Sequence, residues 1–223
     1  MRKAITLMAL SALYATTALA NHGDLTYYWI CYEADESGSG GKNTWLKTCD
    51  GNNIAKVTRH YAERVRVEGT GKLQDGRVIN LSGCDCGDGF SCFDEIDQNR
   101  YPFGIGGSSN PIYPYSSVAA NDFPIGTTLM IQQFQGVVMP RTGGQRHNGC
   151  VRVDDRGWGF GSNHIDFFVA QEKNYHNIDD QLQITSVDYY QTSCNPPNFN
   201  YSSQRSVKDM LYGVSENTFR TNN

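Results

Sequence analysis

Two aspartates in the second half of the chain are the first candidates for acid–base chemistry. Asp155 follows Val151 and Val153 on one face of an alternating segment, and Asp166 lies in His-Ile-Asp-Phe-Phe eleven residues later. A carboxylate among aromatic and β-branched neighbours is costly unless it is paired, hydrogen-bonded or protonated. Because a general acid must keep its proton near neutral pH, this setting suits acid catalysis.

The same carboxylates also have ordinary structural interpretations. Asp155 can cap a turn with its own backbone, and Asp166 can anchor a loop. Asp154 points to the face opposite Asp155, where we expect it to be a solvated partner of Arg152 or Arg156. Spacing alone therefore leaves both a catalytic and a structural role open.

Glu68 is a further catalytic candidate. It ends the alternating segment Arg64–Glu68, which predicts a strand that stops at the turn Gly69-Thr-Gly. On a strand, Glu68 shares a face with Arg66, so the two side chains can also form a simple ion pair.

Short strands separated by turn residues must position these groups. Between residues 83 and 116, glycine, proline and cysteine dominate, and such an irregular stretch often forms one wall of a binding site. A short helix is expected at Val207–Tyr212. Few other helical patterns occur, which favours a small barrel over an α/β layer fold. The predicted strands, besides Arg64–Glu68, are Leu25–Cys31, Val78–Leu81, Thr127–Phe134, Cys150–Asp154, His164–Val169 and Leu182–Tyr190.

The first 20 residues have the pattern of a secretory signal peptide. Arg2 and Lys3 precede an apolar stretch that ends at Ala18-Leu-Ala20, a small-x-small cleavage site. We therefore expect a mature protein that is secreted or periplasmic. All seven cysteines follow this segment, in a compartment where disulfides persist.

The cysteine spacing favours disulfides over a metal site. Cys84, Cys86 and Cys92 could be read as a metal knuckle, but the spacing is not C-x-x-C and no histidine lies nearby. We predict at least two disulfides, no metal and no cofactor. Because seven is odd, one thiol stays free or pairs between chains, and spacing does not tell which.

Composition excludes several classes of protein. The 223 residues include 23 glycines and 12% aromatics, with 19% charged residues against roughly 25% in average chains. The formal net charge is −4, and a negative chain without a basic run is a poor match for nucleic acid. After the signal segment, no apolar run reaches the ~20 residues of a membrane helix.

Three segments in order resemble one family of barrels. Pro124-Ile-Gly-Thr, Asp155-Arg-Gly and Asp166 in Ile-Asp-Phe are similar to motifs of the double-psi β-barrel group. The members meant are the "3D" (three-aspartate) domains of lytic transglycosylases and the rare lipoprotein A-like barrels. The resemblance covers roughly Val65 to Ala170, about half of the mature chain, and Glu68-Gly-Thr-Gly resembles a turn before the substrate groove in some members.

This resemblance implies a mainly β fold, a six-stranded double-psi β-barrel with disulfide-stapled loops and short helices. The implied organisation is a signal peptide over residues 1–20, a barrel domain with a cysteine-rich insert over 21–190, and a C-terminal extension over 191–223. The implied activity is cleavage of β-1,4 glycan strands, most often peptidoglycan. By the same analogy Asp166 acts as acid and then base, with Asp155 as its charged neighbour.

The candidates for the position of the family's first aspartate are Asn121 and Asp122, although the loop before the proline is shorter here. The remaining candidates for substrate binding are aromatic and histidine side chains, each of which also has a structural interpretation. Tyrosine and tryptophan suit both a protein core and sugar stacking. They are Trp158, Tyr113, Tyr115, His164 on the strand face of Asp166, and His147 beside Cys150.

Two other classes of function remain open. A non-catalytic carbohydrate- or wall-binding module would use the same barrel without turnover, and a disulfide-rich effector would use it to bind another protein. One fold hosts unrelated functions, so the fold does not choose among these. A hydrolase would need a second catalytic carboxylate, whereas a transglycosylase would not.

Overall fold

The computed structural model describes residues 20–36, 41–87 and 89–199. Its largest unit is the predicted six-stranded double-psi β-barrel, closed by pairing in the order β1-β11-β8-β10-β9-β12. The pairs β1/β11 and β8/β10 are parallel, and the other four are antiparallel. The strands are β1 (Asn21–Tyr28), β8 (Ser117–Ala119), β9 (Thr128–Ile131), β10 (Cys150–Asp155), β11 (His164–Phe168) and β12 (Ser186–Gln191).

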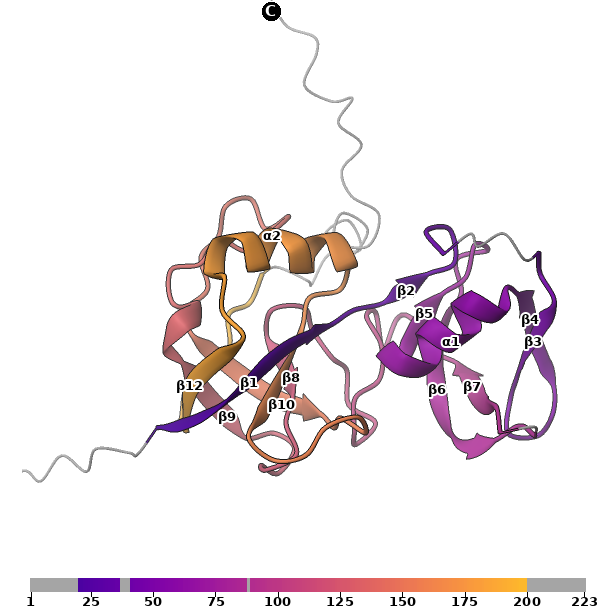
Figure 1. The fold of residues 1–223 in the computed structure, drawn as a ribbon, viewed down its shortest axis with the longest axis horizontal. Helices are drawn as coiled ribbons and strands as arrows, with labels where there is room; N and C mark the ends of the chain where they lie inside the picture. The colour runs from indigo at the N-terminus through magenta and orange to yellow at the C-terminus, as the bar shows by residue number, and fades with distance from the viewer. Residues whose placement is uncertain (1–19, 37–40, 88, 200–223) are drawn as a thin grey trace, which may run out of the picture.

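Side chains that alternate along the strands fill the interior of the barrel. Val151 and Val153 of β10 and Ile165 and Phe167 of β11 are fully buried, as their alternating sequence predicts. Helix α2 (Glu172–Leu182) lies across the barrel in Figure 1, and its Ile178 is fully buried within the same core. The 3-10 turn η1 (Gln132–Phe134) follows β9.

A second unit lies beside the barrel and is reached directly from β1 (Figure 1). It contains a four-stranded sheet in the order β2-β5-β6-β7, a two-stranded hairpin β3-β4 and helix α1. Their bounds are β2 (Cys31–Tyr32), β3 (Thr44–Lys47), β4 (Asn53–Val57), α1 (Arg59–Glu68), β5 (Thr70–Lys72), β6 (Val78–Asp85) and β7 (Ser91–Glu95).

The predicted strand Arg64–Glu68 is wrong, because these residues form the last half of α1. Thr58 caps the helix by accepting a hydrogen bond from the backbone N–H of Tyr61, and burial of Tyr61, Ala62 and Val65 fixes the helix against the sheet. The alternation of charged residues and valine was therefore misread. Helix α2 was also missed, and the predicted strand Leu182–Tyr190 shortens to β12.

Three disulfides confirm the prediction of at least two: Cys49–Cys84, Cys86–Cys92 and Cys150–Cys194. Cys31 is the odd, buried thiol. The first two bridges staple the second unit, and the third ties the chain after β12 to the barrel strand β10.

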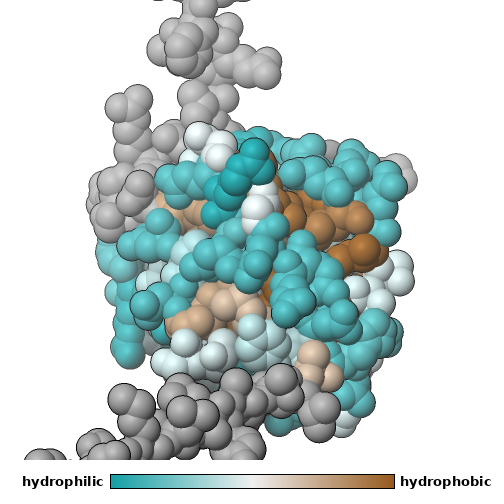
Figure 2. Space-filling model, turned by 90° about the vertical axis from the view of Figure 1, so that its left-hand side faces the viewer, coloured by the Kyte–Doolittle hydropathy of each residue, from teal (hydrophilic) through white to brown (hydrophobic). Residues whose placement is uncertain are grey.

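The predicted signal segment, apart from Ala20, and the helix expected at Val207–Tyr212 lie outside the described residues. Within the described part of the chain, no helix is long and apolar enough to cross a membrane. Figure 2 looks at the barrel end that faces away from the second unit, where hydrophilic side chains predominate and apolar ones show only in smaller areas.

Candidate active site

A cleft of about 520 Å³ is lined by both units. The barrel contributes the end of β1, the end of β8, the β10–β11 loop and β11. The second unit contributes the end of α1, β5, β6 and the glycine loop 105–107. Asp155, Asp166, Glu68, Trp158 and His164, all predicted from sequence, line this cleft together.

Asp166 lies on β11, directly opposite Thr26 of the parallel strand β1. The Thr26 hydroxyl donates to Asp166 Oδ1 at 2.8 Å and lies 2.7 Å from His164 Nε2. Since the single hydroxyl proton goes to Asp166, Nε2 of His164 must carry the proton that it donates to Thr26. Burial raises the pKa of Asp166 to about 6, although the Thr26 hydrogen bond opposes this by favouring the charged form.

Asp155 ends β10, just after a register shift between Val153 and Asp155. Its Oδ1 accepts from the backbone N–H of Arg156 at 2.8 Å, and its carboxyl group interacts with the Tyr28 hydroxyl. Burial, with a smaller contribution from the negative charge of Asp166, raises the pKa of Asp155 to about 7. The two aspartates therefore titrate as a coupled pair just below neutral pH.

Glu68 faces the cleft from the end of α1. Its Oε2 accepts from the backbone N–H of Trp29 at 3.2 Å, and its Oε1 lies 3.9 Å from Nη1 of Arg64. The predicted ion pair between Glu68 and Arg66 is wrong, because residues four apart, and not two apart, share a face of a helix. Burial raises the pKa of Glu68 to about 7, while the Trp29 N–H and Arg64 oppose that shift.

The β10–β11 loop carries the exposed aromatic side chain of the cleft. Trp158 is 68% exposed, and Phe160 stacks on the His164 ring at 4.1 Å with an interplanar angle of 10°. The amide of Asn121 donates to the carbonyls of Gly157 and Phe160, which fixes the loop. A rigid loop with an outward indole can offer a flat face to a sugar ring.

Four predicted site residues lie away from the cleft. Asp122 is exposed and accepts from the backbone N–H of Asn163, so it holds the turn before β11. Tyr115 is fully buried and donates to Pro140 O, so its predicted role in substrate binding has no geometric basis.

His147 is 2% exposed and bonds Tyr115 O through Nε2, while its Nδ1 accepts from the N–H of Gly149. Burial lowers its pKa to about 4, so it is a neutral structural histidine. Tyr113 lines a different pocket on the barrel. Asp154 pairs with Arg152 at 2.7 Å as predicted, but it is buried and not solvated.

Thr26 was not predicted from sequence, and Tyr28 was predicted only as either a core or a sugar-stacking residue, without a place beside the aspartates. They lie two residues apart on β1 and face the cleft together. The strand itself was predicted, so alternation could have placed both on one face. What the sequence lacked was the register that sets Thr26 against Asp166.

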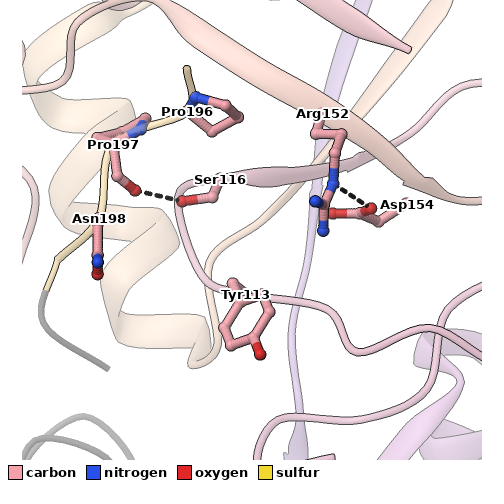
Figure 3. Close-up of a pocket in the computed structure, with 7 residues that line it drawn as sticks. All are labelled: Tyr113, Ser116, Arg152, Asp154, Pro196, Pro197 and Asn198. Atoms are coloured by element: carbon pink, nitrogen blue, oxygen red, sulfur yellow. Dashed lines mark hydrogen bonds and ion pairs between the residues drawn. The ribbon is translucent and has the colours of Figure 1, made fainter. Parts of the chain in front are cut away.

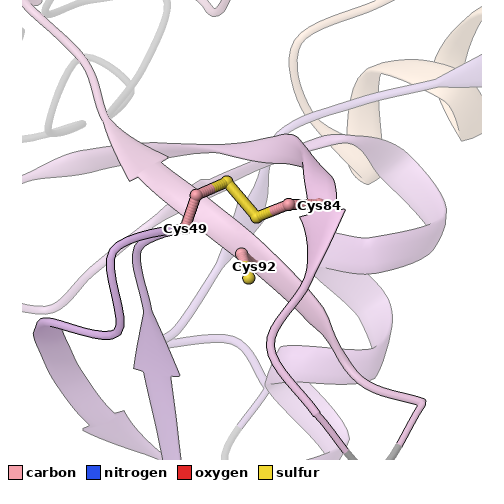
Figure 4. A group of neighbouring side chains, drawn as sticks. All are labelled: Cys49, Cys84 and Cys92. Carbon is pink, nitrogen blue, oxygen red and sulfur yellow. A yellow bond between two sulfur atoms is a disulfide. The ribbon is translucent and has the colours of Figure 1, made fainter.

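One cluster of potential metal ligands occurs in the described residues, the sulfurs of Cys49, Cys84 and Cys92, which lie within 4.8 Å of one another (Figure 4). All three belong to disulfides, and a disulfide sulfur is not the thiolate that binds metal. These residues therefore act as staples.

No family model matches the chain, and no curated protein matches it. Among solved structures, MltA of E. coli with bound chitohexaose is similar at 12% identity, with a TM-score of 0.54, over 79% of this chain and 73% of that one. A membrane-bound lytic murein transglycosylase from Agrobacterium tumefaciens is similar at 11% identity and TM-score 0.48, over 76% and 73% of the two chains.

LtgG of Burkholderia pseudomallei, a lytic transglycosylase, is similar at 16% identity and TM-score 0.40, over 78% of this chain and 73% of that one. At such identities the likeness to MltA shows the fold alone. The chain thus resembles the lytic transglycosylases in fold, as its motifs predicted.

Proposed function

We propose that this protein cleaves the β-1,4-linked glycan strands of peptidoglycan as a lytic transglycosylase, with Asp166 as the acid and then the base. The observation that carries the proposal is a pair of buried carboxyl groups, Asp166 and Asp155, with pKa values of about 6 and about 7 in one open cleft. The fold shared with MltA supports the same reaction by analogy.

In the proposed reaction, protonated Asp166 gives its proton to the glycosidic oxygen as the bond from that oxygen to the anomeric carbon breaks. The sugar's own 6-hydroxyl then bonds to the anomeric carbon, and the Asp166 carboxylate takes the hydroxyl proton. One product carries a 1,6-anhydro ring and the other a free hydroxyl. No water is consumed, and Asp166 ends as it began.

The neighbours of Asp166 have distinct proposed roles. Thr26 orients the carboxyl group through its 2.8 Å hydrogen bond. Asp155 keeps a proton in the pair by like-charge repulsion. Glu68, on the opposite wall, is a third group that can exchange a proton near neutral pH. Trp158 and His164 are proposed to contact the glycan.

The proposed location is the periplasm or the exterior of the cell. Three disulfides support it, because such bridges persist in oxidising compartments. The proposed partner is the glycan itself, with no nucleic acid involved, since the chain carries a net charge of −4 without a basic run.

Hydrolysis is the second candidate. In the sheet, the backbones of Asp155 and Asp166 flank the same residue of β8, Ala119, from its two sides. One carboxyl group could therefore act as the acid and the other activate water. Inverting glycosidases use two carboxyl groups separated by about 6.5–9.5 Å to leave room for that water.

Product analysis tests these proposals. Purified sacculi, chitin and cellulose are digested separately, and the soluble products are identified by mass. Anhydro-ended muropeptides from sacculi are the expected result. Reducing ends would instead establish hydrolysis, and tight binding without products would establish a carbohydrate-binding module. If the protein neither releases products nor binds these glycans, the remaining class is an effector that binds another protein.

A further inference from the structure

A second pocket, of about 360 Å³, is not used by the proposed mechanism. Three parts of the chain line it: the loop before β8 with Tyr113 and Ser116, strand β10 with Arg152 and Asp154, and residues 196–198 after β12 (Figure 3). Asp154 lines this pocket whereas the next residue of β10 lines the cleft, so the two cavities open on different faces of one strand.

Hydrogen bonds hold the polar side chains of this pocket in place. The Asp154 side chain is only 3% exposed, and it accepts from Arg152 Nε at 2.7 Å and from the Ser117 hydroxyl at 2.5 Å. Arg152 is 40% exposed, and among the described residues its terminal nitrogens have no acceptor. In Figure 3 the guanidinium extends toward the space above Tyr113. Its N–H donors are thus held in place and available to a ligand.

The apolar wall is equally fixed. Pro196 and Pro197 face the pocket, and the Ser116 hydroxyl donates to Pro197 O at 2.8 Å. The disulfide Cys150–Cys194 joins the same segment to β10, because Cys194 lies two residues before Pro196 and Cys150 lies two residues before Arg152. Because the walls are tied by a covalent bridge and a hydrogen bond, the pocket is preformed.

The chemistry of the walls identifies the class of ligand. Arg152 and Asp154 neutralise each other, so the pocket has no net charge to attract a free anion. The tyrosine and proline rings offer apolar faces, and the guanidinium of Arg152 offers hydrogen bonds. A pyranose ring has the matching surface, an apolar C–H face with hydroxyl groups at its edge. Pockets for small ligands start at about 300 Å³, so this one suits a short segment.

We infer that this pocket is a second saccharide-binding site, separate from the cleft, which takes one or two neutral sugar units of a glycan. The inference rests on the proposed function only in taking a glycan as the ligand. A polymer held at both sites stays close to the cleft between cleavage events, since a second contact raises the effective concentration of substrate. Short oligosaccharides, which cannot reach both sites, gain nothing from it.

Amide NMR of the ¹⁵N-labelled Asp166→Asn protein tests this inference, because that variant should bind sugar without cleaving it. Chitotriose is titrated, and signals near Trp158 report the cleft while signals near Ser116 and Asn198 report the second pocket. Two variants on this background target the pocket. Asn198→Trp fills it, and Arg152→Lys keeps the charge but loses the planar fork of donors.

The expected result is two groups of shifted signals. Asn198→Trp abolishes the pocket group, and Arg152→Lys weakens it by about tenfold, while the cleft group is unchanged in both. Trp158→Ala, the matched control in the cleft, weakens only the cleft group. In each case unshifted signals from buried residues that line neither cavity, Ile178 of α2 in the barrel core and Leu46 of β3 in the second unit, verify that the protein is folded.

Chitotriose shifts confined to the cleft would overturn the inference. A pocket group that appears with glucuronate but not with chitotriose would also overturn it, since the ligand would then be an anion. If the pocket group appears and the cleft group does not, the second site stands and the proposed function of the cleft fails.

Discussion

Asp155 and Asp166 lie on the two sides of Ala119, which pairs with Asp155 of β10 and with Asp166 of β11. Adjacent strands are about 4.8 Å apart, so the two backbones are separated by roughly 10 Å, and their side chains face one cleft. Burial raises the pKa values of both carboxyl groups. The barrel topology, which places β8 between two strands that follow it in sequence, creates this pair.

Replacing Asp155 by asparagine should shift the pH dependence of the reaction more than it lowers the maximal rate. Asp166 has the lower pKa of the two, so after it ionises one proton remains shared in the pair, mainly on Asp155, and Asp155→Asn removes that shared proton. The fall in kcat/KM with rising pH should then begin at a lower pH than in the wild type. A profile of unchanged shape would contradict the coupling of the two groups.

Removing the Thr26 hydroxyl should change the titration of Asp166 in the opposite direction. The hydrogen bond of 2.8 Å favours the charged carboxylate, so Thr26→Val should raise the pKa of Asp166 and lower kcat through loss of orientation. Thr26→Ser keeps the donor and is the matched control. Both pKa values can be read by ¹³C NMR of the aspartate carboxyl groups, and an unchanged value in Thr26→Val would refute this role.

The stability of the protein should fall as the pH rises from about 4 to about 7. Asp155, Asp166 and Glu68 bind protons more tightly in the folded protein than in the unfolded chain, because burial raises their pKa values to about 7, 6 and 7. Unfolding therefore releases protons in this interval, and their contribution is fully present only below the lower limit.

Urea unfolding at pH 4 and pH 8 measures this effect. At pH 8, Asp155→Asn should be more stable than the wild type by roughly 1–3 kcal/mol, and at pH 4 the two should be nearly equal. An equal difference at both pH values would mean that the variant acts through packing and not through charge.

The sequence predicted five of the six barrel strands, because these alternate within single segments, but it missed β8, which has only three residues and is buried throughout. β10 and β11 match their predicted ranges to within one residue. The helix α1 could not be recognised in the same way, because Arg-Val-Arg-Val alternates like a strand while its real pattern, Tyr61 with Val65, depends on the sheet beneath it.

The site was predictable only in part, for a related reason. The motifs located Asp155 and Asp166, but the partners Thr26 and Tyr28 come from a strand about 140 residues away, as the Thr26–Asp166 separation shows. The burial of Tyr115 and His147 likewise depends on tertiary packing, so their residue types alone suggested ligand contacts that the fold does not allow.

The disulfide between Cys150 and Cys194 should be a main source of stability for the barrel. It joins residues 44 positions apart, and a native bridge of this kind is worth about 2–5 kcal/mol. The double variant Cys150→Ala/Cys194→Ala should therefore melt at a clearly lower temperature. Cys31→Ala, which removes a buried free thiol, is the control that breaks no bridge. Equal melting temperatures for the double variant and the wild type would contradict the prediction.

The central claim is that Asp166 carries the proton, and the most direct test is the rate at which Asp166→Asn releases products from sacculi. Asparagine keeps the size of the side chain but cannot deliver a proton, so turnover should fall by about 10²–10⁴-fold. Folding and binding of chitohexaose should be unchanged. Asp180→Asn, which alters an exposed carboxylate of α2, should keep full activity. If Asp166→Asn released anhydro-ended products at the wild-type rate, the claim would be contradicted, and Glu68 would be the next acid to test.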